Sequence, residues 1–486
     1  MTPLGTGTVT IASGATLDLN FLQLDNPLNA LTGAILLNTG TSQTVDVTDS
    51  VIFSGTTAGT VVVENGGSAE FHGDVNATVT VVPGAAAVFD ASAGGTPTVT
   101  VQNGGVVAVA GTAAGSWTVA GTGTFSGPLV GSLAVNNGGF VAFSGSSSNG
   151  PSSSFNVAAG GLVNVASAAT IGGQLHVSGS AVIAGAITSD ADVIVESGGR
   201  VTLVDGASFA QNSLLNDGNL IIDRDIPLAL ATAVSGSGGL EKLGLGVLEL
   251  LGANTFSGPT AVNGGTLLLQ GSLASDVIVA AATTLGGSGS IAGAISGAGF
   301  VSPGNSPGIL EAAAFDPTGG LGAEFEFTAF APNYSVTGTG ALNDVLRLTA
   351  AAPFNDGTLT AGNVFDVYLN RLTVEYQDQF EGGFYAEQFT PEQLLAAVQN
   401  ATFVGWIRTT GAGVRSFGGF DYNPIDYNPA LPGFQVTTKA GPGGVGAVTE
   451  FIAIPEPSTV CLASLGLLGL LGHVTRLRQW LRMPRR

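Results

Sequence analysis

The sequence predicts an all-β protein built as a parallel β-helix (a solenoid) over residues 1–310, followed by a small β-rich module over residues 311–453 and a tail with one apolar helix over residues 454–486. Three observations predict this: a glycine-rich and charge-poor composition, a recurring strand–glycine–strand motif, and composition changes near residues 311 and 454. Glycine supplies 75 of the 486 residues and charged residues only 10%. This balance suits stacked strands and tight turns and argues against helical bundles.

The recurring motif reads apolar, any, apolar, two residues, Gly with Gly or Ala, one residue, apolar, any, apolar. In residues 61–71, the alternation puts Val61, Val63, Ala69 and Phe71 on one side, as a half-buried strand requires. The Asn-Gly-Gly between the two halves supplies positive φ at a sharp corner. The motif begins at Val9, Val61, Val79, Val99, Leu133, Phe155 and Val193, with looser copies at Trp117 and Leu175.

The spacing of the motif predicts a solenoid. Close copies lie 18, 20 and 22 residues apart, so one repeat forms one coil and each strand pairs with its equivalents in the neighbouring coils. An ordinary hairpin sandwich is the alternative, but it does not predict an in-phase motif at one-coil spacing. At about 4.8 Å per coil, about 15 coils make a rod of roughly 70 Å. A rod of this kind suits a protein that displays a binding region or holds other structures apart.

Residues 239–271 carry a family resemblance. They begin Gly-Leu-Glu-Lys-Leu-Gly-Leu-Gly-Val-Leu-Glu-Leu-Leu-Gly-Ala-Asn-Thr-Phe-Ser-Gly and closely resemble the autotransporter-associated β-strand repeat. The later Val-Ser-Pro-Gly-Asn-Ser-Pro-Gly at residues 301–308 resembles the segment that often closes such passengers. The resemblance implies a right-handed β-helix exposed outside the cell. It assigns no activity.

Charge and the scarcity of reactive side chains exclude several functions. Residues 1–454 carry 8 basic and 33 acidic groups, so this body repels phosphate backbones and nucleic acid is not an expected partner. The three histidines and one cysteine predict no metal site, no cofactor and no catalytic residue. His72 and His176 fall in different coils with no cysteine or second histidine nearby, so neither metal-site spacing nor a catalytic triad can be drawn.

One pair of carboxylates suggests an alternative. Asp223 and Asp225 point the same way from one strand, with Arg224 opposite, and paired carboxylates on a β-helix suit a polysaccharide lyase or hydrolase. A solvated charged edge is the preferred interpretation.

Residues 311–453 have a different core. They hold 21 of the 34 aromatic residues, including all six tyrosines. Thr390-Pro391-Glu392-Gln393 places a capping hydroxyl before a proline and a glutamine, which predicts a short helix over 390–401. Residues 364–369 and 402–407 read as strands. The tyrosines could form a sugar-binding face, but core aromatics are the commoner role.

The tail combines three features in a fixed order. Pro455-Glu456-Pro457 is followed by an apolar helix over 460–474 and by the arginines Arg476, Arg478, Arg482, Arg485 and Arg486. About 15 helical residues span some 22 Å, short of a bilayer core of about 30 Å, which suits a transient membrane segment. The arginines hold the end in the cytoplasm, and the prolines leave the motif extended and accessible.

This order of elements resembles the PEP-CTERM sorting signal, with Pro455, Glu456 and Pro457 as the motif. The resemblance implies recognition by an exosortase, a membrane protease-transpeptidase of Gram-negative bacteria, which cuts the tail away and delivers the body to the surface or matrix. A simple tail anchor is the alternative interpretation.

These observations predict a non-enzymatic, exported surface or extracellular-matrix protein, with an exosortase as partner and an exopolysaccharide as a further candidate partner. The alternatives are a polysaccharide-degrading enzyme on the same scaffold and a sugar-binding adhesin. Residues 1–20 show neither the basic region nor the apolar region of a signal peptide. We therefore expect Met1 to be a truncated or misassigned start.

Overall fold

The computed structural model describes residues 9–18, 28–30, 34–37, 39, 44–147, 153–188, 190–304, 308–316, 321–323, 345–348, 403–409, 415–419, 434–440 and 447–453. The chain divides into two compact units, Met1–Val277 and Ile278–Arg486. The sequence-based boundary at residue 310 stays a prediction. The helix expected over 390–401, the strand expected over 364–369 and the whole tail over 454–486 lie outside the described residues.

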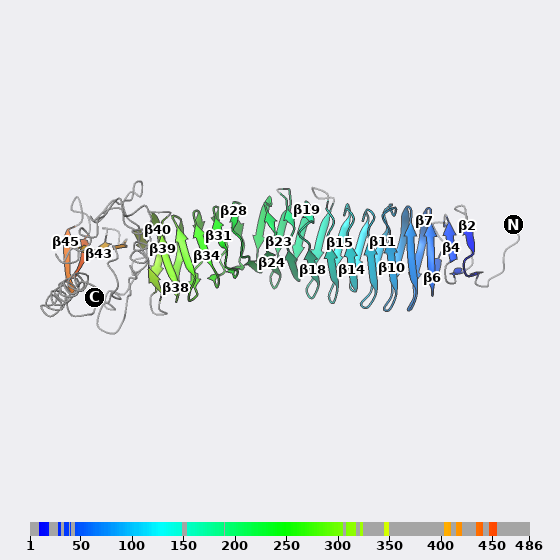
Figure 1. Ribbon diagram of the computed structural model, residues 1–486, viewed down its shortest axis with the longest axis horizontal. Coiled ribbons are helices and arrows are strands. Elements are labelled where there is room, and N and C mark those ends of the chain that lie inside the picture. Colours follow the sequence, from blue (N-terminus) through cyan, green and yellow to red (C-terminus); the bar gives the residue numbers. More distant parts are fainter. Residues whose placement is uncertain are drawn as a thin grey trace, which may run out of the picture. The chain divides into compact units, whose positions relative to one another are not determined.

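The first unit consists of parallel β-coils (Figure 1). Each coil adds one strand to a first sheet, turns a corner and adds one strand to a second sheet. The first sheet contains β1 (Val9–Ile11), β3 (Leu28–Ala30), β5 (Thr44–Val47), β7 (Thr57–Val63), β9 (Val75–Val81), β11 (Thr98–Val101), β13 (Ser116–Val119), β15 (Ser132–Val135), β17 (Ser154–Val157), β20 (Gln174–Val177), β23 (Asp192–Val195), β26 (Ser213–Asn216) and β29 (Val234–Ser235).

The second sheet runs beside it through the same coils. It contains β2 (Thr16–Asp18), β4 (Ala34–Leu37), β6 (Ser50–Ser54), β8 (Ser68–His72), β10 (Ala86–Phe89), β12 (Val106–Val109), β14 (Thr122–Phe125), β16 (Phe140–Phe143), β18 (Leu162–Val165), β21 (Ser180–Ile183), β24 (Arg200–Val204), β27 (Asn219–Asp223), β30 (Gly239–Lys242) and β33 (Thr260–Val262).

Later coils add short strands on a third side. One set is β19 (Thr170–Ile171), β22 (Ala186–Ile187) and β25 (Ser208–Phe209), and another is β28 (Leu228–Leu230), β31 (Val247–Leu250) and β34 (Thr266–Leu269). In addition, β32 (Ala253–Asn254) pairs with β35 (Ser272–Leu273), and β36 spans Val277–Val279. The predicted parallel β-solenoid is confirmed, with about 15 turns.

The inward side chains are those that the motif predicts. Val61, Val63, Ala69 and Phe71 are all 0% exposed. The motif's first residues stack in register along the first sheet, as Val61, Val79, Val99, Trp117, Leu133, Phe155, Leu175 and Val193. Trp117 belongs to this column, and its indole N–H donates to the carbonyl of Ala114 at 2.8 Å. The looser copies are therefore true coils.

Glycine is needed at the corner between the sheets. Gly66 has φ of 85°, a conformation that only glycine adopts without strain. A Cβ on the next residue, Gly67, would lie 2.2 Å from the carbonyl oxygen of Val47 in the preceding coil. The two successive glycines have different roles. Gly66 adopts the positive φ of the turn, and Gly67 allows close contact with the backbone of the preceding coil.

Aromatic rings form a stack inside the first unit. The rings of Phe53, Phe71 and Phe89 lie parallel with centroids 4.8 and 4.6 Å apart, and Trp117 meets Phe89 edge-on at 4.9 Å. Such pairs add about 0.5–1.5 kcal/mol each to the burial of their area. The stack ties successive coils together through the core.

A lysine occupies one core position of the second sheet. Lys242 is 1% exposed and takes the place that Ile222 and Val262 occupy in the adjacent coils. Its Nζ donates to the carbonyl oxygens of Gly244 and Gly264, the latter at 3.3 Å. Burial lowers the pKa of Lys242, and the carboxylates of Asp223 and Asp225 oppose that shift.

The second unit contains both parallel and antiparallel strands. The parallel pairs join β37 (Thr284–Gly287), β39 (Phe300–Pro303) and β41 (Gly322–Ala323), and separately β38 (Ser290–Gly297), β40 (Ile309–Phe315) and β42 (Val345–Leu348). The antiparallel pairs involve β42, β43 (Phe403–Thr409), β44 (Arg415–Gly419), β45 (Phe434–Ala440) and β46 (Ala447–Ala453). β43 overlaps the strand predicted over 402–407.

Replacing Phe71 by alanine tests the aromatic stack. We expect F71A to cost about 3–5 kcal/mol, because it leaves a cavity between Phe53 and Phe89. The control is V88A, since Val88 lies on the neighbouring strand and is 36% exposed. The midpoint of urea unfolding followed by circular dichroism measures both. Equal urea midpoints for the two variants would show that the aromatic stack adds no stability beyond that of an exposed strand residue.

Replacing Lys242 by methionine tests the buried ammonium. Because the pKa of Lys242 is lowered by folding, the unfolded chain binds the proton more tightly, and stability must rise with pH toward the ordinary lysine pKa of 10.5. We expect K242M to lack this rise. The thermal midpoint of both proteins as a function of pH is the measurement, and parallel profiles would contradict the burial of a charged group.

Candidate functional site

The predicted sorting residues cannot be placed. Pro455, Glu456, Pro457 and the arginines from Arg476 to Arg486 lie outside the described residues. Within the part of the chain that the structure describes, no helix is long and apolar enough to cross a membrane. The sorting signal therefore stays a prediction from the sequence.

The carboxylate pair at residues 223 and 225 has only part of the predicted geometry, because β27 ends at Asp223 and Asp225 lies in the bend that follows the strand. Asp223 and Asp225 are exposed, whereas Arg224 between them is 4% exposed and points inward. The Arg224 guanidinium donates to backbone carbonyl oxygens of the preceding coil, those of Val204 and Ala207.

Asp225 is itself part of a corner. Its carboxylate accepts the backbone N–H of Leu245 in the next coil at 2.8 Å. One coil earlier, Asp205 accepts the N–H groups of Asp225 and Ile226 at 3.0 and 3.2 Å. These aspartates fasten one coil to the next, which accounts for their positions without catalysis and favours the interpretation as a charged edge.

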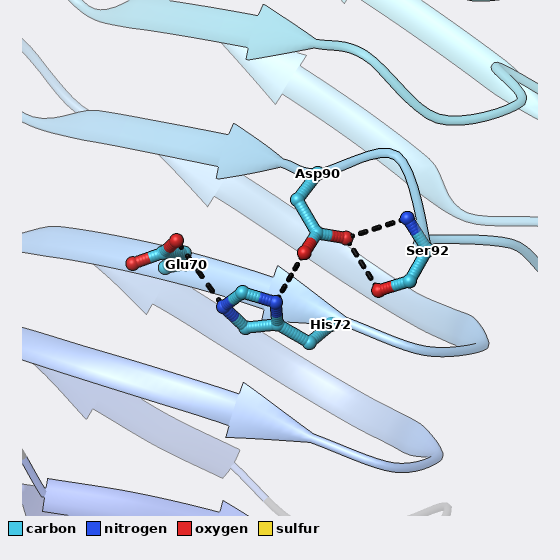
Figure 2. A network of polar contacts seen from close by, with 4 residues as sticks. All are labelled: Glu70, His72, Asp90 and Ser92. Carbon is cyan, nitrogen blue, oxygen red and sulfur yellow. Dashed lines mark hydrogen bonds and ion pairs between the residues drawn. The ribbon is translucent and has the colours of Figure 1, made fainter.

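A cluster that the sequence did not reveal surrounds His72 at the end of β8 (Figure 2). One imidazole nitrogen, Nδ1, contacts Asp90, and the other, Nε2, lies 3.2 Å from Glu70. Asp90 also accepts the backbone N–H of Ser92 at 2.8 Å and its hydroxyl at 2.6 Å. The side chains of Glu70, His72 and Asp90 are 47%, 34% and 29% exposed, so the cluster lies in contact with water.

The stacking of coils brings this cluster together. Phe71 pairs with Phe89 across β8 and β10, so His72 and Asp90, the residues that follow them, come to the same corner. Their separation is 18 residues, the coil spacing that the motif itself shows. That spacing was the signal that could have found Asp90 as the partner of His72.

The order of contacts limits the chemistry of the cluster. In a serine nucleophile triad, the histidine holds the serine hydroxyl on one nitrogen and the carboxylate on the other. Here Glu70 takes the position of the hydroxyl, and Ser92 donates to Asp90 instead. The imidazole of His72 therefore lies between two carboxylates, and Ser92 has no histidine to take its proton.

Metal binding finds no support in the same residues. Glu70 and Asp90 lie on opposite nitrogens of the His72 ring, so the three groups do not converge on one point. Among the described residues generally, no three histidine, cysteine or acidic side chains are placed to hold a metal ion.

Hydrogen bonds help to lower the pKa values of two surface aspartates, Asp90 and Asp192. Desolvation raises the pKa of Asp90, but the Ser92 hydroxyl and N–H together with the charge of His72 outweigh it and bring the pKa below its usual value. The pKa of Asp192 is lowered by hydrogen bonds from Ser213 and Asn212, and His176 adds to the effect. Both aspartates thus stabilise the fold in their charged form.

Comparison with known proteins identifies the repeat. Residues 240–269 match the family model described as passenger-associated-transport-repeat. Over 79 residues the chain is 48% identical to a protein of Serratia marcescens named extracellular serine protease, covering 16% of this chain and 8% of that protein. Over 120 residues it is 33% identical to adhesin BmaC autotransporter of Brucella suis biovar 1 (strain 1330), covering 24% of this chain and 3% of that protein. No solved structure matches the chain.

These similarities confirm one prediction and correct another. The autotransporter-associated repeat predicted over 239–271 is confirmed by the match over 240–269. The prediction of a protein without enzymatic activity is wrong as drawn, because one of the two relatives is named a serine protease. The shared stretches cover only 8% and 3% of the two relatives, so the chain spans a small part of the length of the proteins that it matches.

The pH dependence of stability tests the cluster around His72. Because folding lowers the pKa of Asp90, its contribution is fully present above the ordinary value of 3.8 and is lost as the pH falls through the folded-state pKa. We expect D90N to lose up to about 1 kcal/mol at neutral pH, the range of exposed ion pairs, and to match the wild type in acid.

A second variant separates the two partners of Asp90. S92A removes only the hydroxyl donor, so we expect it to lower the free energy of unfolding by part of the amount that D90N does. Thermal unfolding between neutral and acidic pH measures all three proteins. An offset between D90N and the wild type that persists unchanged in acid would contradict the assignment of the effect to the charge of Asp90.

Proposed function

We propose that this protein is an exported surface protein whose coils form a stiff, acidic support for display outside the cell. The match of residues 240–269 to the passenger-associated-transport-repeat carries the proposal. The names of the two relatives, an extracellular protease and an autotransporter adhesin, support the same location.

The physical properties of the coils fit display. Each coil in the first unit is hydrogen-bonded to the coils on either side, and the inward side chains of the central coils are almost fully buried. Such a support needs no disulfide, in agreement with a single cysteine in the whole sequence. A net charge of −21 keeps copies apart in solution and disfavours association with nucleic acid.

The C-terminal tail supplies a proposed route to the surface. Pro455, Glu456 and Pro457 form the recognition motif for an exosortase, the segment 460–474 inserts transiently into the inner membrane, and the arginines from Arg476 to Arg486 stay in the cytoplasm. Cleavage then releases the body to the surface or the extracellular matrix of a Gram-negative bacterium. The coincidence of motif, short apolar run and arginine cluster in the sequence supports this route.

Adhesion is a second candidate function. The name of the Brucella relative, adhesin BmaC autotransporter, favours it, and the aromatic-rich residues 311–453 offer a composition suited to binding sugars, an exopolysaccharide included. Binding of the full chain to a glycan array, with and without mutations of the tyrosines in that range, tests this candidate.

Antibody labelling of intact cells of the native host tests export and sorting together. We expect the wild type to be labelled at the surface or in the matrix, and the triple variant P455A/E456A/P457A to stay in the membrane fraction with its tail uncut. The matched control is S458A/T459A, which changes the next two residues and should be sorted normally.

The possible results separate the two parts of the proposal. Labelling that requires permeabilised cells, for the wild type as well, would refute export. If the triple variant is labelled normally at the surface and has the same mass as the processed wild type, sorting through the tail is refuted and export is not.

A further inference from the structure

The outward face of the first sheet carries a continuous column of hydroxyl groups. In-register pairing aligns the outward positions of β5, β7, β9, β11, β13, β15 and β17 without a shift. Each of these seven positions holds threonine or serine, namely Thr44, Thr60, Thr78, Thr98, Ser116, Ser132 and Ser154. Parallel strands place neighbouring members about 4.8 Å apart.

A second column runs beside the first over its central coils. Thr80, Thr100 and Thr118 are paired in register and lie two residues further along their strands. Two residues of a strand cover about 6.6 Å. The coils of β9, β11 and β13 therefore present a two-dimensional array of hydroxyl and methyl groups, which we call the ladder face.

The tendency of threonine to occur in strands does not explain the ladder face. The second sheet is built from the same coils, yet its equivalent outward column reads Ser50, Ser68, Ala86, Val106, Thr122, Phe140 and Leu162. Hydroxyls are thus continuous on one sheet and scattered on the other.

Asp74 and Asp90 border the coil of β9, but the coils that follow it, up to residue 189, carry no acidic or basic side chain other than His176. Residues 91–189 contain no aspartate, glutamate, lysine or arginine, in a chain whose net charge is −21. Charged groups bind water strongly in their own orientation. Their removal from five successive coils leaves a surface where only weak, regularly spaced hydroxyl groups and methyl groups meet the solvent.

The core holds the ladder face rigid. Behind it, Val79, Val99, Trp117 and Leu133 are at most 1% exposed and alternate with the outward residues. On the face itself, Thr78 and Thr98 are exposed, while Thr80, Thr100 and Thr118 are half-buried between neighbours. The array is therefore fixed before any ligand arrives, which lowers the entropic cost of binding.

The size and composition of the ladder face disfavour a protein partner and a sugar held on aromatic rings. The three strands of the ladder face, counted at four residues each, give roughly 190 Å², well below the ~800 Å² per partner of a stable protein interface. Sugar-binding faces use exposed aromatic rings, but the aromatic side chains of the strands that carry the first column, Trp117 and Phe155, point inward and are at most 1% exposed.

We propose that the ladder face binds the surface of an ice crystal. Its shorter repeat, along the columns, is close to a repeat of oxygen atoms on the prism faces of ice, so hydroxyl groups can take lattice positions along a column and methyl groups can hold the water between them in order. No covalent step is involved. The proposal rests on the coils alone and does not depend on export or sorting.

Inhibition of ice recrystallisation by the purified full-length protein tests the proposal. We expect the wild type to inhibit, and T98Y/T100Y to need at least about tenfold more protein, equivalent to a loss of roughly 1.4 kcal/mol, because two tyrosines break the array. The matched control is T122Y/T124Y, which makes the same change in the next coil on the second sheet, where both threonines are exposed. This control should inhibit like the wild type.

Two further measurements keep the result interpretable. T98V/T100V keeps the shape of the side chains and removes only the hydroxyl groups, so a reduced activity assigns the effect to hydroxyl contacts. Circular dichroism and thermal unfolding should show that the wild type and all variants are equally folded.

Several outcomes would overturn the proposal. These are a wild type that does not inhibit recrystallisation, equal losses in T98Y/T100Y and T122Y/T124Y, or a wild type that is excluded from slowly growing ice. If T98Y/T100Y instead abolishes binding to an insoluble neutral glucan, or dimerisation in sedimentation, in a wild type without ice activity, the ladder face serves that partner and not ice.

Discussion

Every feature of the first unit depends on the in-register hydrogen bonding of each strand to the equivalent strands one coil before and one coil after. A strand residue in one coil faces its counterpart about 4.8 Å away, and the pairing of β7, β9, β11 and β13 runs without a shift. A side chain therefore keeps the same neighbours by position, coil after coil. Any property that recurs once per coil becomes a continuous column on the surface or in the core.

This constraint explains both the stability and the chemistry of the coils. Inside, phenylalanines at one position become a stack of rings, and glycines at the corners let the coils approach to contact. Outside, the same rule lines up hydroxyl groups on one sheet and brings His72 to Asp90 at a corner. The aspartates at residues 205 and 225 bind the N–H groups of the following coil for the same reason. The polar contacts of His72, Asp205 and Asp225 thus join neighbouring coils.

Several of these contacts were within reach of the sequence, and others were not. The inward positions of Val61, Val63, Ala69 and Phe71 followed from alternation alone, because a strand has a period of two. The pairing of His72 with Asp90 needed only the 18-residue coil spacing that the motif shows. The burial of Lys242 was not predictable, because a lysine in a strand ordinarily faces water, and its burial requires two carbonyl oxygens within reach of its ammonium group.

The sequence by itself determined the parallel solenoid, the inward side chains and the repeat at residues 239–271, since all three are written in local periodicity and glycine placement. A sorting motif at residues 455–457 stays a prediction that rests on the order of the elements in the tail. Only the tertiary structure decided which coils lie in register, and with that which outward residues become neighbours. The physical reason is that coil lengths vary between neighbours, so the corner lengths absorb the differences. The continuous hydroxyl column on the first sheet appears only after the strands have been paired.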